Sequence, residues 1–319
     1  RFAKVFPFDL RPQGQDIIRT WLFSTLLRSE LEHGALPWKN AAISGWILDP
    51  DRKKMSKSKG NVVVPNELLE THGSDAVRYW AASARLGTDA AFDEGQMKIG
   101  RRLANKLLNA GRFALSFELP AGITEVSEPI DQAMLANLRE VIATATKAFE
   151  SYDHTKALES AETFFWTFTD DYLELVKERA YASGDQTPQQ VGSAVIALRR
   201  ALGVLVRLFA PFIPFAAEEV WSWWQQGSVH LASWPEVEEI EFTDSALMPL
   251  ASSALILVRK SKSDAKLSMK AEIEQLTLNG NANLRLIQDD LKAVGKIQNL
   301  QLQVADELSI SDLRFLEEQ

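Results

Sequence analysis

One short basic segment, DPDRKKMSKSKGNVV at residues 49–63, contains the residues whose types and spacing best suit a chemical role. Five positive charges fall within eight of its residues, interleaved with serine hydroxyls and followed by Gly60 and Asn61. Ammonium groups, hydroxyl donors and a backbone freed by glycine together suit a polyphosphate. The segment is therefore the first candidate binding site of the chain.

The ordinary alternative is a solvated surface loop, which is what most lysine-rich loops are. Three features favour binding here: the segment follows a predicted strand, its lysines alternate with serines beside glycine, and no glutamate interrupts the positive charge. A glycine-rich loop of the GxxxxGK[ST] type is absent from the sequence, which excludes an ordinary P-loop. We therefore expect a phosphate-binding loop of another kind.

The residues before this loop predict the elements that must position it. Residues 2–10 are typical of an apolar strand, residues 16–34 have helical spacing that stops at Gly34, and residues 41–49 form a second predicted strand. Strand, helix and strand with short joins indicate a β-α-β unit with parallel strands. Because ligands of open α/β sheets bind at the carboxyl ends of strands, the loop lies where a substrate is expected.

From Pro65 the pattern becomes helical. A short helix is expected to end at Gly73, Ser74 is expected to cap the next one, and the polar stretch 120–129 separates later helices. Long helices with short joins predict a bundle. Its predicted members are the amphipathic helix 97–117, an aromatic-rich helix in the segment KALESAETFFWTFTDDYLELVKERAY, and the helices 193–210 and 215–224.

The composition changes again near residue 243. A helix with the basic tract 259–270 leads to the strand EIEQLTLNG, the helix NLRLIQDDLKAVG and the strand NLQLQVADE. This order indicates a small α+β unit. The basic tract is a candidate contact for an RNA backbone, whereas the acidic run at Asp170, Asp171 and Glu174 is expected to be a solvated face.

Bulk properties narrow the function classes. The 319 residues carry a net charge of -8, which disfavours broad nonspecific polyanion binding but allows a local basic patch. The absence of cysteine excludes disulfides and thiolate metal ligands, and the four widely spaced histidines favour no structural metal. No apolar run is long enough to span a bilayer, so we expect a cytoplasmic protein without a membrane partner. Since the first residue is Arg1, we expect a processed start or a piece of a longer protein.

The string KMSKS at residues 54–58, and KMSKSKGN as a whole, match the second signature of class I aminoacyl-tRNA synthetases. Over almost the entire chain the sequence resembles the valyl-tRNA synthetases. The resemblance is carried by RPQGQDIIRTWLFSTL, SGWILD, GSDAVRYWAAS, FDEGQMKIGRRLANKLLNAGRF, DDYLELVKERAY, LFAPFIPFAAEEVW and VHLASWP. Isoleucyl-tRNA synthetases are similar in layout, but they usually carry DQ-R-GWF where this chain has DIIRTW, and they often end in a cysteine-rich zinc module.

The resemblance implies a multidomain fold. We expect a partial α/β Rossmann-type catalytic piece at 1–96, an all-α anticodon-binding bundle at 97–242 and a small α+β domain at 243–319. The chain resembles the C-terminal part of the family, because no HIGH motif and no inserted editing domain occur in it. The nearest string, HGAL at 33–36, has the wrong place and pattern. We expect the isolated chain to be inactive.

In the family, the valine carboxylate attacks the α-phosphate of ATP, which is used with Mg²⁺, and pyrophosphate leaves. A cationic loop over the leaving group stabilises the transition state more than the ground state. The resemblance makes Lys57 the first choice for that contact, with Lys54 beside it. Ser56 and Ser58 are expected to donate hydrogen bonds to ATP, and Met55 is expected to anchor the loop.

The resemblance also implies contacts outside the loop. It places Gly14 and Asp16 near the ATP ribose; a helix N-cap is the alternative role for Asp16. On the predicted helix from residue 97, four polar residues fall on one face and are candidates for contact with tRNA(Val). They are Arg101, Asn105, Asn109 and Arg112. An ordinary wet helix face is the alternative.

Two further expectations concern the surface and the assembly. The tryptophans at 221, 223, 224 and 234 are expected to pack rather than to stack on bases, and the protein is expected to be a monomer. A non-catalytic tRNA-binding module is the alternative from a different functional class. A HIGH motif upstream in the gene would decide in favour of the enzyme.

Overall fold

The computed structural model describes residues 2–316, and the side chain of Lys57 lies outside that description. The chain divides into two compact units. The first consists of Arg1–Lys106, Thr146–Glu159 and Pro211–Ala216, and the second of Leu107–Ala145, Ser160–Ala210 and Ala217–Gln319. The predicted three-domain boundaries at 96/97 and 242/243 stay a prediction.

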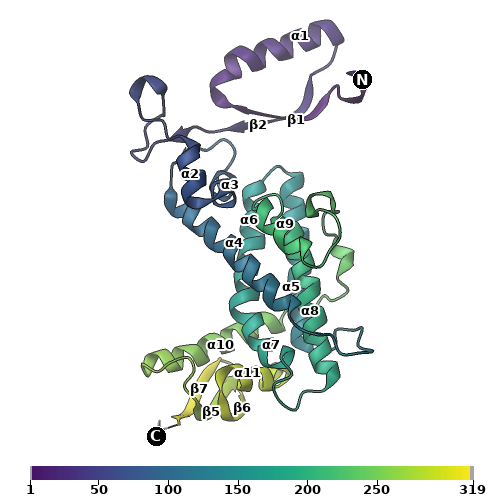
Figure 1. Cartoon of the computed structure of the whole chain (residues 1–319), viewed down its shortest axis with the longest axis vertical. Coiled ribbons are helices and arrows are strands. Elements are labelled where there is room, and N and C mark those ends of the chain that lie inside the picture. Colours follow the sequence, from purple (N-terminus) through teal and green to yellow (C-terminus); the bar gives the residue numbers. More distant parts are fainter. Residues whose placement is uncertain (1, 317–319) are drawn as a thin grey trace. The chain divides into compact units, whose positions relative to one another are not determined.

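The first unit begins with the predicted β-α-β arrangement. Strand β1 (Phe8–Gly14) pairs in parallel with β2 (Trp38–Ser44), and helix α1 (Phe23–His33) lies in the connection between them (Figure 1). The first strand starts later than predicted, since residues Phe2–Lys4 form a 3-10 turn and the ladder begins only after Pro7, which has no N–H to donate. The parallel pairing is confirmed.

The predicted strand 41–49 is two strands. After β2 the chain passes Gly45 and forms β3 (Ile47–Leu48), which pairs in parallel with β4 (Ala90–Ala91). A Cβ atom on Gly45 would come within 2.1 Å of the Thr88 carbonyl oxygen, so only glycine fits this close to the Thr88 backbone. At Gly45 the chain leaves its pairing with β1 and begins to pair with β4.

The helix predicted at 16–34 is built from three successive segments. A 3-10 turn (Gln15–Ile17) and a π-helical turn (Ile18–Leu22) precede α1. The predicted stop is confirmed: Gly34 adopts the left-handed conformation with φ 63° and donates its N–H to the Glu30 carbonyl.

Three helices follow the basic loop. They are α2 (Pro65–His72), α3 (Ser74–Ala82) and α4 (Glu94–Leu115). The prediction that Ser74 caps α3 is wrong by one residue, because Gly73 occupies the cap position and no side chain there makes a capping hydrogen bond. The acid at the next position, Asp75, instead accepts hydrogen bonds from the Phe215 and Ala216 N–H groups in the first turn of a later helix, α9.

Long helices after residue 128 form the predicted bundle. They are α5 (Pro129–Glu150), α6 (His154–Thr167), α7 (Leu173–Ala180), α8 (Pro188–Phe209) and α9 (Pro214–Ser222). Sequence analysis did not assign α5. Leu198, Leu202, Leu205 and Phe209, at helical spacing along α8, have no exposed surface and form the centre of the core.

The aromatic-rich helix is interrupted. A π-helical turn (Phe168–Tyr172) separates α6 from α7, so the predicted single helix is two helices joined end to end. The predicted core role of its aromatic residues is confirmed: Phe165 and Tyr172 have no exposed surface, and Phe168 is 1% exposed.

The last segment contains a helix and a mixed sheet, in agreement with the predicted α+β order. Helix α10 (Leu247–Asp264) precedes a three-stranded sheet of order β6-β5-β7 (Figure 1). Helix α11 (Gln288–Gly295) lies in the connection from β5 to β6 along the chain. The strands are β5 (Ile273–Gly280), β6 (Ile297–Val304) and β7 (Ser309–Phe315). Strand β5 is parallel to β6 and antiparallel to β7; the strand β7 was not predicted. Short 3-10 turns occur at Lys57–Lys59, Val229–Leu231, Val237–Glu239 and Ala282–Ile287.

A buried ionic network joins the elements of the second unit. The Arg179 guanidinium forms two hydrogen bonds with the Asp131 carboxylate, at 2.8 and 2.9 Å, and two with Asp290, at 2.9 and 3.1 Å. Tyr172 and Ser193 donate their hydroxyls to Asp131 as well. Burial opposes the charge on Arg179, but the attraction of Asp131 and Asp290 outweighs it, so the pKa of Arg179 is raised. The network links α5, α7, α8 and α11.

Candidate functional site

The basic loop leaves strand β3 through a tight turn. Asp49 donates its N–H to the Lys53 carbonyl, and its carboxylate accepts the Lys53 N–H at 2.7 Å. Arg52, between them, has a positive φ of 60°. The turn fixes the start of the loop on the end of β3, which is the position expected for a ligand-binding loop of a parallel sheet.

A single side chain, that of Asn61, holds the two ends of the loop together. Its amide nitrogen donates to the Asp49 carboxylate at 2.7 Å and to the Lys54 carbonyl at 3.3 Å. Its amide oxygen accepts the Ser56 N–H at 3.0 Å. Gly60, with φ 66°, allows the chain to turn back so that Asn61 can reach these groups. The backbone of the motif is therefore held in place by hydrogen bonds to a side chain of the loop itself.

Asp49 is the acceptor at the centre of this arrangement. The side chain is 7% exposed, and the hydrogen bond from Asn61, followed by that from the Lys53 N–H, lowers the pKa of the carboxyl group. Both donors are neutral amides. The loop is thus closed around a carboxylate without consuming the charge of any lysine.

Of the motif side chains that the structure describes, Lys54 and Ser58 are exposed, whereas Met55 and Ser56 are half-buried. Lys54 places its ammonium 3.4 Å from the centre of the Trp46 ring, a cation–π contact. The hydroxyls of Ser56 and Ser58 lie 3.2 Å apart, and Met55 is half-buried, as expected for a residue that anchors the loop. The side chain of Lys57, the first candidate for catalysis, lies outside the described residues.

The other predicted ATP-binding segment reaches the same region. Gly14 ends β1 in register with Ser44, where both parallel strands finish. The next residue, Gln15, donates to the Asp89 carboxylate at 3.4 Å, and the same carboxylate oxygen accepts the Trp46 N–H at 2.7 Å. The Trp46 ring is in cation–π contact with Lys54. Asp89, which binds both Gln15 and Trp46, therefore links the segment 14–16 to the loop.

Asp16 does not cap a helix. The N-cap of the 3-10 turn is Gly14, no side-chain capping bond is formed there, and Asp16 is exposed. The capping alternative for Asp16 is therefore wrong. The Asp16 carboxylate lies close to Gly14: a Cβ atom added to Gly14 would be 2.6 Å from Oδ1 of Asp16. The open face of Gly14 and an exposed carboxylate are compatible with the predicted ribose contact, which stays a prediction.

Sequence reasoning missed four residues that organise this region. Asn61 was visible inside the motif, and Asp49 at the end of the strand before it, but their pairing was not predicted. Trp46 and Asp89 gave no local signal, because their contacts depend on the pairing of β3 with β4.

The candidate tRNA-binding residues lie on α4, and all four are exposed. Arg101 donates a hydrogen bond to the Thr71 carbonyl at 2.9 Å, in the last turn of α2. A cation at this end of a helix is stabilised by the negative end of the helix dipole. The Arg112 guanidinium lies 5.5 Å from the centre of the Trp223 ring. The other two, Asn105 and Asn109, form no side-chain hydrogen bond with any of the described residues. Exposure is what an RNA contact requires, but it does not distinguish that role from an ordinary wet face.

Two surface predictions need correction. Not all of the basic tract 259–270, a candidate contact for an RNA backbone, is freely available on the surface: Lys262 is 2% exposed, and Arg259 is paired with Asp171 at 3.0 Å. Asp171 is therefore not part of a fully solvated acidic face; only its neighbour Asp170 is exposed. Of the tryptophans, Trp221 and Trp224 pack on each other with ring centres 5.6 Å apart, as predicted.

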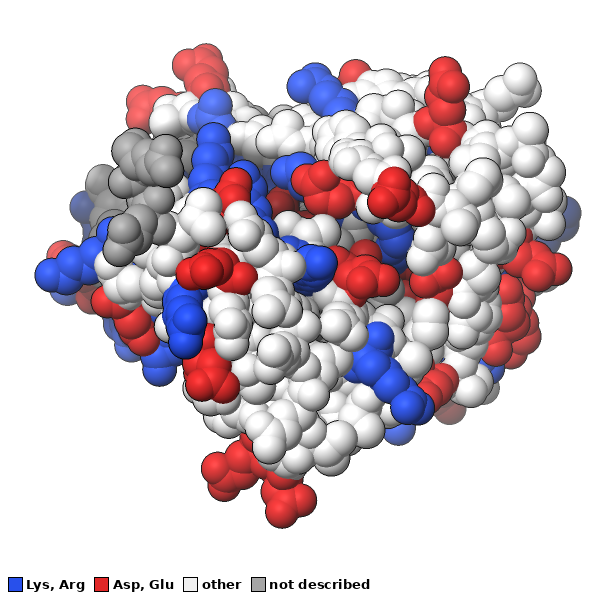
Figure 2. All heavy atoms as spheres, turned by 90° about the horizontal axis from the view of Figure 1, so that it is seen from below, with Lys and Arg blue, Asp and Glu red and all other residues white. Residues whose placement is uncertain are grey.

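Neither the face drawn in Figure 2 nor the clustering of metal-binding side chains among the described residues singles out a further site. Basic and acidic groups are interspersed on the face in Figure 2. No group of three His, Cys, Asp or Glu side chains among the described residues could hold a metal ion. Within the same residues, every helix is too short or too polar to cross a membrane.

Comparison with known families gives two matches. Residues 131–278 match the family model described as the anticodon-binding domain of tRNA ligase, and residues 1–93 match the model of class I tRNA synthetases (I, L, M and V). The second match contains the loop 49–61, and the first contains nearly all of α5 and the whole of α6 to α10.

Two curated relatives bear the name valine--tRNA ligase. The chain is 60% identical, over 97% of its length, to the valine--tRNA ligase of Thermobifida fusca (strain YX), and 56% identical, over 98%, to that of Leifsonia xyli subsp. xyli. It spans 36% and 37% of the length of these relatives. Among solved structures, the LeuRS of Agrobacterium radiobacter K84, in a ternary complex with tRNA and LeuAMS, covers 94% of the chain with a TM-score of 0.55 at 17% identity. That likeness supports the fold alone.

Proposed function

Since the chain belongs to the class I tRNA synthetases and matches their valine--tRNA ligases along nearly its whole length, we propose that it acts as part of a valine–tRNA ligase. In this role it supplies the KMSKS loop and the anticodon-binding region to an enzyme that activates valine with ATP and transfers it to tRNA(Val). The observation that carries the proposal is the 60% identity over 97% of the chain. The curated relatives bear the valine name, which disfavours the isoleucyl alternative.

The loop would act on the leaving group of valine activation. As pyrophosphate separates from the α-phosphate, its negative charge grows, and ammonium groups held nearby stabilise that state more than bound ATP. Lys57 is proposed to make the main contact and Lys54 a second one. Lys54 must leave the Trp46 ring to do so, which is inexpensive because an exposed cation–π contact contributes only about 0.5–1 kcal/mol.

The remaining ATP contacts follow from the positions of the neighbouring groups. The hydroxyls of Ser56 and Ser58, 3.2 Å apart, can donate to the same phosphate. Asp16 would accept from the ribose hydroxyls, with Gly14 leaving room for the sugar. Mg²⁺ would enter as the MgATP complex, held by the phosphates of the substrate.

The helical part is proposed to hold tRNA. Arg101, Asn105, Asn109 and Arg112 would face the RNA, with guanidinium groups on phosphates and amides on bases. The finer layout follows the same proposal: a Rossmann-type piece at 1–96, the anticodon-binding bundle at 97–242 and an α+β domain at 243–319, in a cytoplasmic monomer.

Exposed apolar side chains support the idea that this chain works within a larger catalytic unit. On α1, Phe23 is 60% exposed, Leu27 48% and Leu31 77%, and Phe8 on β1 is 54% exposed. Phe23, Leu27 and Leu31 are four residues apart along one face of α1, and an exposed apolar face of this kind often meets another protein surface. Such a surface would be supplied by the rest of the catalytic fold.

The test is a charging assay with the longer protein that contains this chain. We expect transfer of valine to tRNA(Val) and strong discrimination against isoleucine. The chain on its own, without a HIGH motif, is expected to give no valine-dependent pyrophosphate exchange above background. Exchange by the chain alone would contradict its role as a part, and charging with isoleucine in preference to valine would contradict the substrate.

A further inference from the structure

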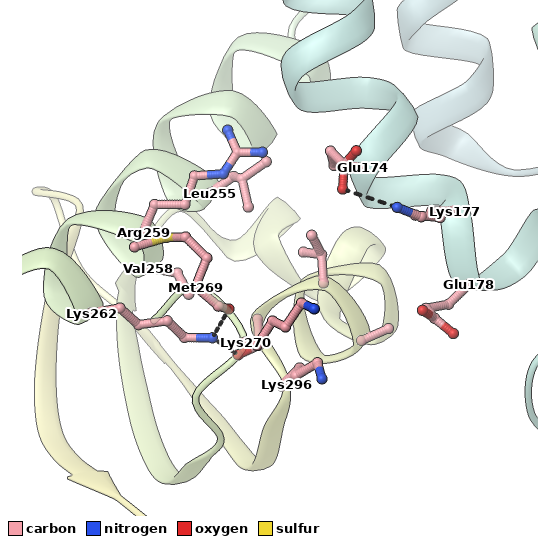
Figure 3. Close-up of a pocket in the computed structure, with 13 residues that line it drawn as sticks. Glu174, Lys177, Glu178, Leu255, Val258, Arg259, Lys262, Met269, Lys270 and Lys296 are labelled. Carbon is pink, nitrogen blue, oxygen red and sulfur yellow. Dashed lines mark hydrogen bonds and ion pairs between the residues drawn. The ribbon is translucent and has the colours of Figure 1, made fainter. Parts of the chain in front are cut away.

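A pocket of 430 Å³ lies in the second unit, between helix α7 on one side and α10 with the end of α11 on the other (Figure 3). It contains no residue of the loop 49–61 or of the candidate tRNA-binding face on α4. Its size falls within the usual range for small-molecule sites, about 300–1,000 Å³. Nine of its thirteen lining residues lie within the match to the anticodon-binding domain, but neither that match nor the proposed chemistry of the loop gives this pocket a ligand.

A buried lysine lies at the base of this pocket. Lys262 is 2% exposed, and its ammonium donates to the carbonyls of Met269, at 3.0 Å, and Gly295, at 2.7 Å. An ammonium has three N–H donors, so one is left over. Within the described residues Lys262 forms no ion pair, although a buried charge is normally matched by an opposite one.

Other cations surround the same space. Lys270 and Lys296 line the wall beside Lys262, are exposed, and form no ion pair within the part of the chain that is described (Figure 3). Lys296 is close enough to contribute, after burial, to the lowered pKa of Lys262. These three lysines therefore make an unbalanced cluster of positive charge.

The acidic groups of the pocket do not offset this cluster. Glu174, on the facing helix α7, is 3.7 Å from Lys177, and Arg259 is paired with Asp171 at 3.0 Å. Glu178 also lines the α7 wall, without an ion pair among the described residues (Figure 3). Three unmatched ammonium groups against one unmatched carboxylate leave the pocket positive.

The rest of the lining is apolar. Leu255 and Val258 are 1% and 2% exposed, and Met269, whose carbonyl binds Lys262, leaves 49% of its surface exposed. Flexible lysines act as point charges that can share several oxygens of a phosphate, and thioether and aliphatic groups suit a flat, weakly polar ring beside it. Charge and apolar surface together match a nucleotide better than a simple anion.

We propose that this pocket binds a phosphate-bearing nucleotide unit, with Lys262, Lys270 and Lys296 around the phosphate. The ligand is either a free nucleotide or one unit of an RNA strand, since both offer the same phosphate and base. The RNA form of the ligand rests on the proposed function, whereas the free-nucleotide form does not. Because the pocket contains no residue of the loop at 49–61, its test measures binding and is separate from the activation reaction.

The experiment is calorimetric titration of the chain, at low salt, with inorganic phosphate, AMP and a single-stranded RNA hexamer. The pocket variant carries Lys270→Gln and Lys296→Gln. The matched control carries Lys266→Gln and Lys292→Gln, exposed lysines of the same two segments that do not line the pocket. We expect the pocket variant to lose about tenfold or more in affinity, and the control less than about twofold.

The arms also identify the source of the ligand. Binding of AMP and phosphate alone indicates a free nucleotide, and binding of the hexamer without AMP indicates RNA; either result supports the pocket. Equal losses in both variants, or no saturable binding of any probe, would overturn it. As a check that needs no variant, the Met269 and Gly295 amide resonances should shift on titration, and resonances that move only elsewhere would also overturn the proposal.

Discussion

Two aspartates organise the two best-defined polar regions of this protein, and they do so in opposite ways. Asp49 accepts hydrogen bonds from neutral amides that lie 4 and 12 residues away in the same loop. Asp131, with no exposed surface, accepts from Tyr172, Arg179 and Ser193, which lie 41, 48 and 62 residues away. One carboxylate orders a loop, and the other joins helices.

This difference predicts which property each aspartate supports, ligand binding for Asp49 and the free energy of unfolding for Asp131. Neutral donors around Asp49 leave the lysine charges free for a ligand, and the loop can change shape without disturbing a core. The Asp131 carboxylate is matched by a guanidinium that is also bonded to Asp290, so its removal leaves a buried charge unbalanced. The first region is built for binding, and the second for stability.

The largest expected effect is the loss of stability when the buried Asp131 carboxylate is removed. Asp131→Ala should lower the free energy of unfolding by about 3–5 kcal/mol, because Arg179 loses its main counter-charge inside the core. Urea unfolding followed by circular dichroism measures this. Asp289→Ala, an exposed acid on the same helix as Asp290, is the control and should stay within about 0.5 kcal/mol. A loss below about 1 kcal/mol for Asp131→Ala would show that the network is not a structural link.

The next prediction addresses the loop. Asn61→Ala should change the free energy of unfolding by less than about 1.5 kcal/mol, since the bonds it removes are local. In the longer enzyme it should slow valine activation roughly ten- to hundredfold, because the backbone of the motif is no longer held in place. Asn66→Ala, an exposed asparagine just beyond the loop, serves as the control. Normal activation kinetics in Asn61→Ala would mean that the observed loop geometry is irrelevant to function.

A third group, the exposed side chains of α4, should show an intermediate effect. Arg101→Ala with Arg112→Ala should weaken binding of tRNA(Val) about tenfold and reduce the slope of log K against log salt by roughly two, one for each lost phosphate contact. Filter binding at several salt concentrations measures both values. Arg285→Ala with Arg314→Ala, exposed arginines of the α+β segment, removes the same charge elsewhere. An equal loss in both pairs would indicate diffuse attraction rather than an RNA-binding face.

The smallest effect concerns pH. The pKa of Asp49 lies below its ordinary value of 3.8 because Asn61 and the Lys53 N–H bind the ionised form. A depressed pKa means that the loop contacts are fully present above pH 3.8 and are lost as the pH falls through the lower, folded-state value. The Asn61 side-chain NMR signals should follow that transition. In Asn61→Ala the Asp49 titration should move up; a wild-type midpoint at or above 3.8 would contradict the assignment.

The sequence allowed the local features to be predicted and left out those that depend on folding. The basic loop, the stop at Gly34, the aromatic core of α6 and the parallel pairing of β1 and β2 were all predicted from spacing and residue type. The burial of Lys262 was not predicted, because a lysine in a basic tract gives no sign that tertiary contacts will bury it. Asp89 escaped notice for a similar reason: its partners come from β-strand pairing.

The account's central claim is that the loop after β3 acts on the leaving group of valine activation, and Lys57 tests it most directly. In the longer enzyme, Lys57→Ala should lower the rate constant of activation roughly 10²–10³-fold, with little change in valine or tRNA binding, because its charge is needed only as pyrophosphate leaves. Lys53→Ala and Lys59→Ala, neighbouring lysines outside the core motif, should have far smaller effects, since solvated charges are screened. Pre-steady-state activation kinetics of the three variants give the answer. Equal and mild losses in all three would contradict the claim and reduce the loop to a diffuse positive patch.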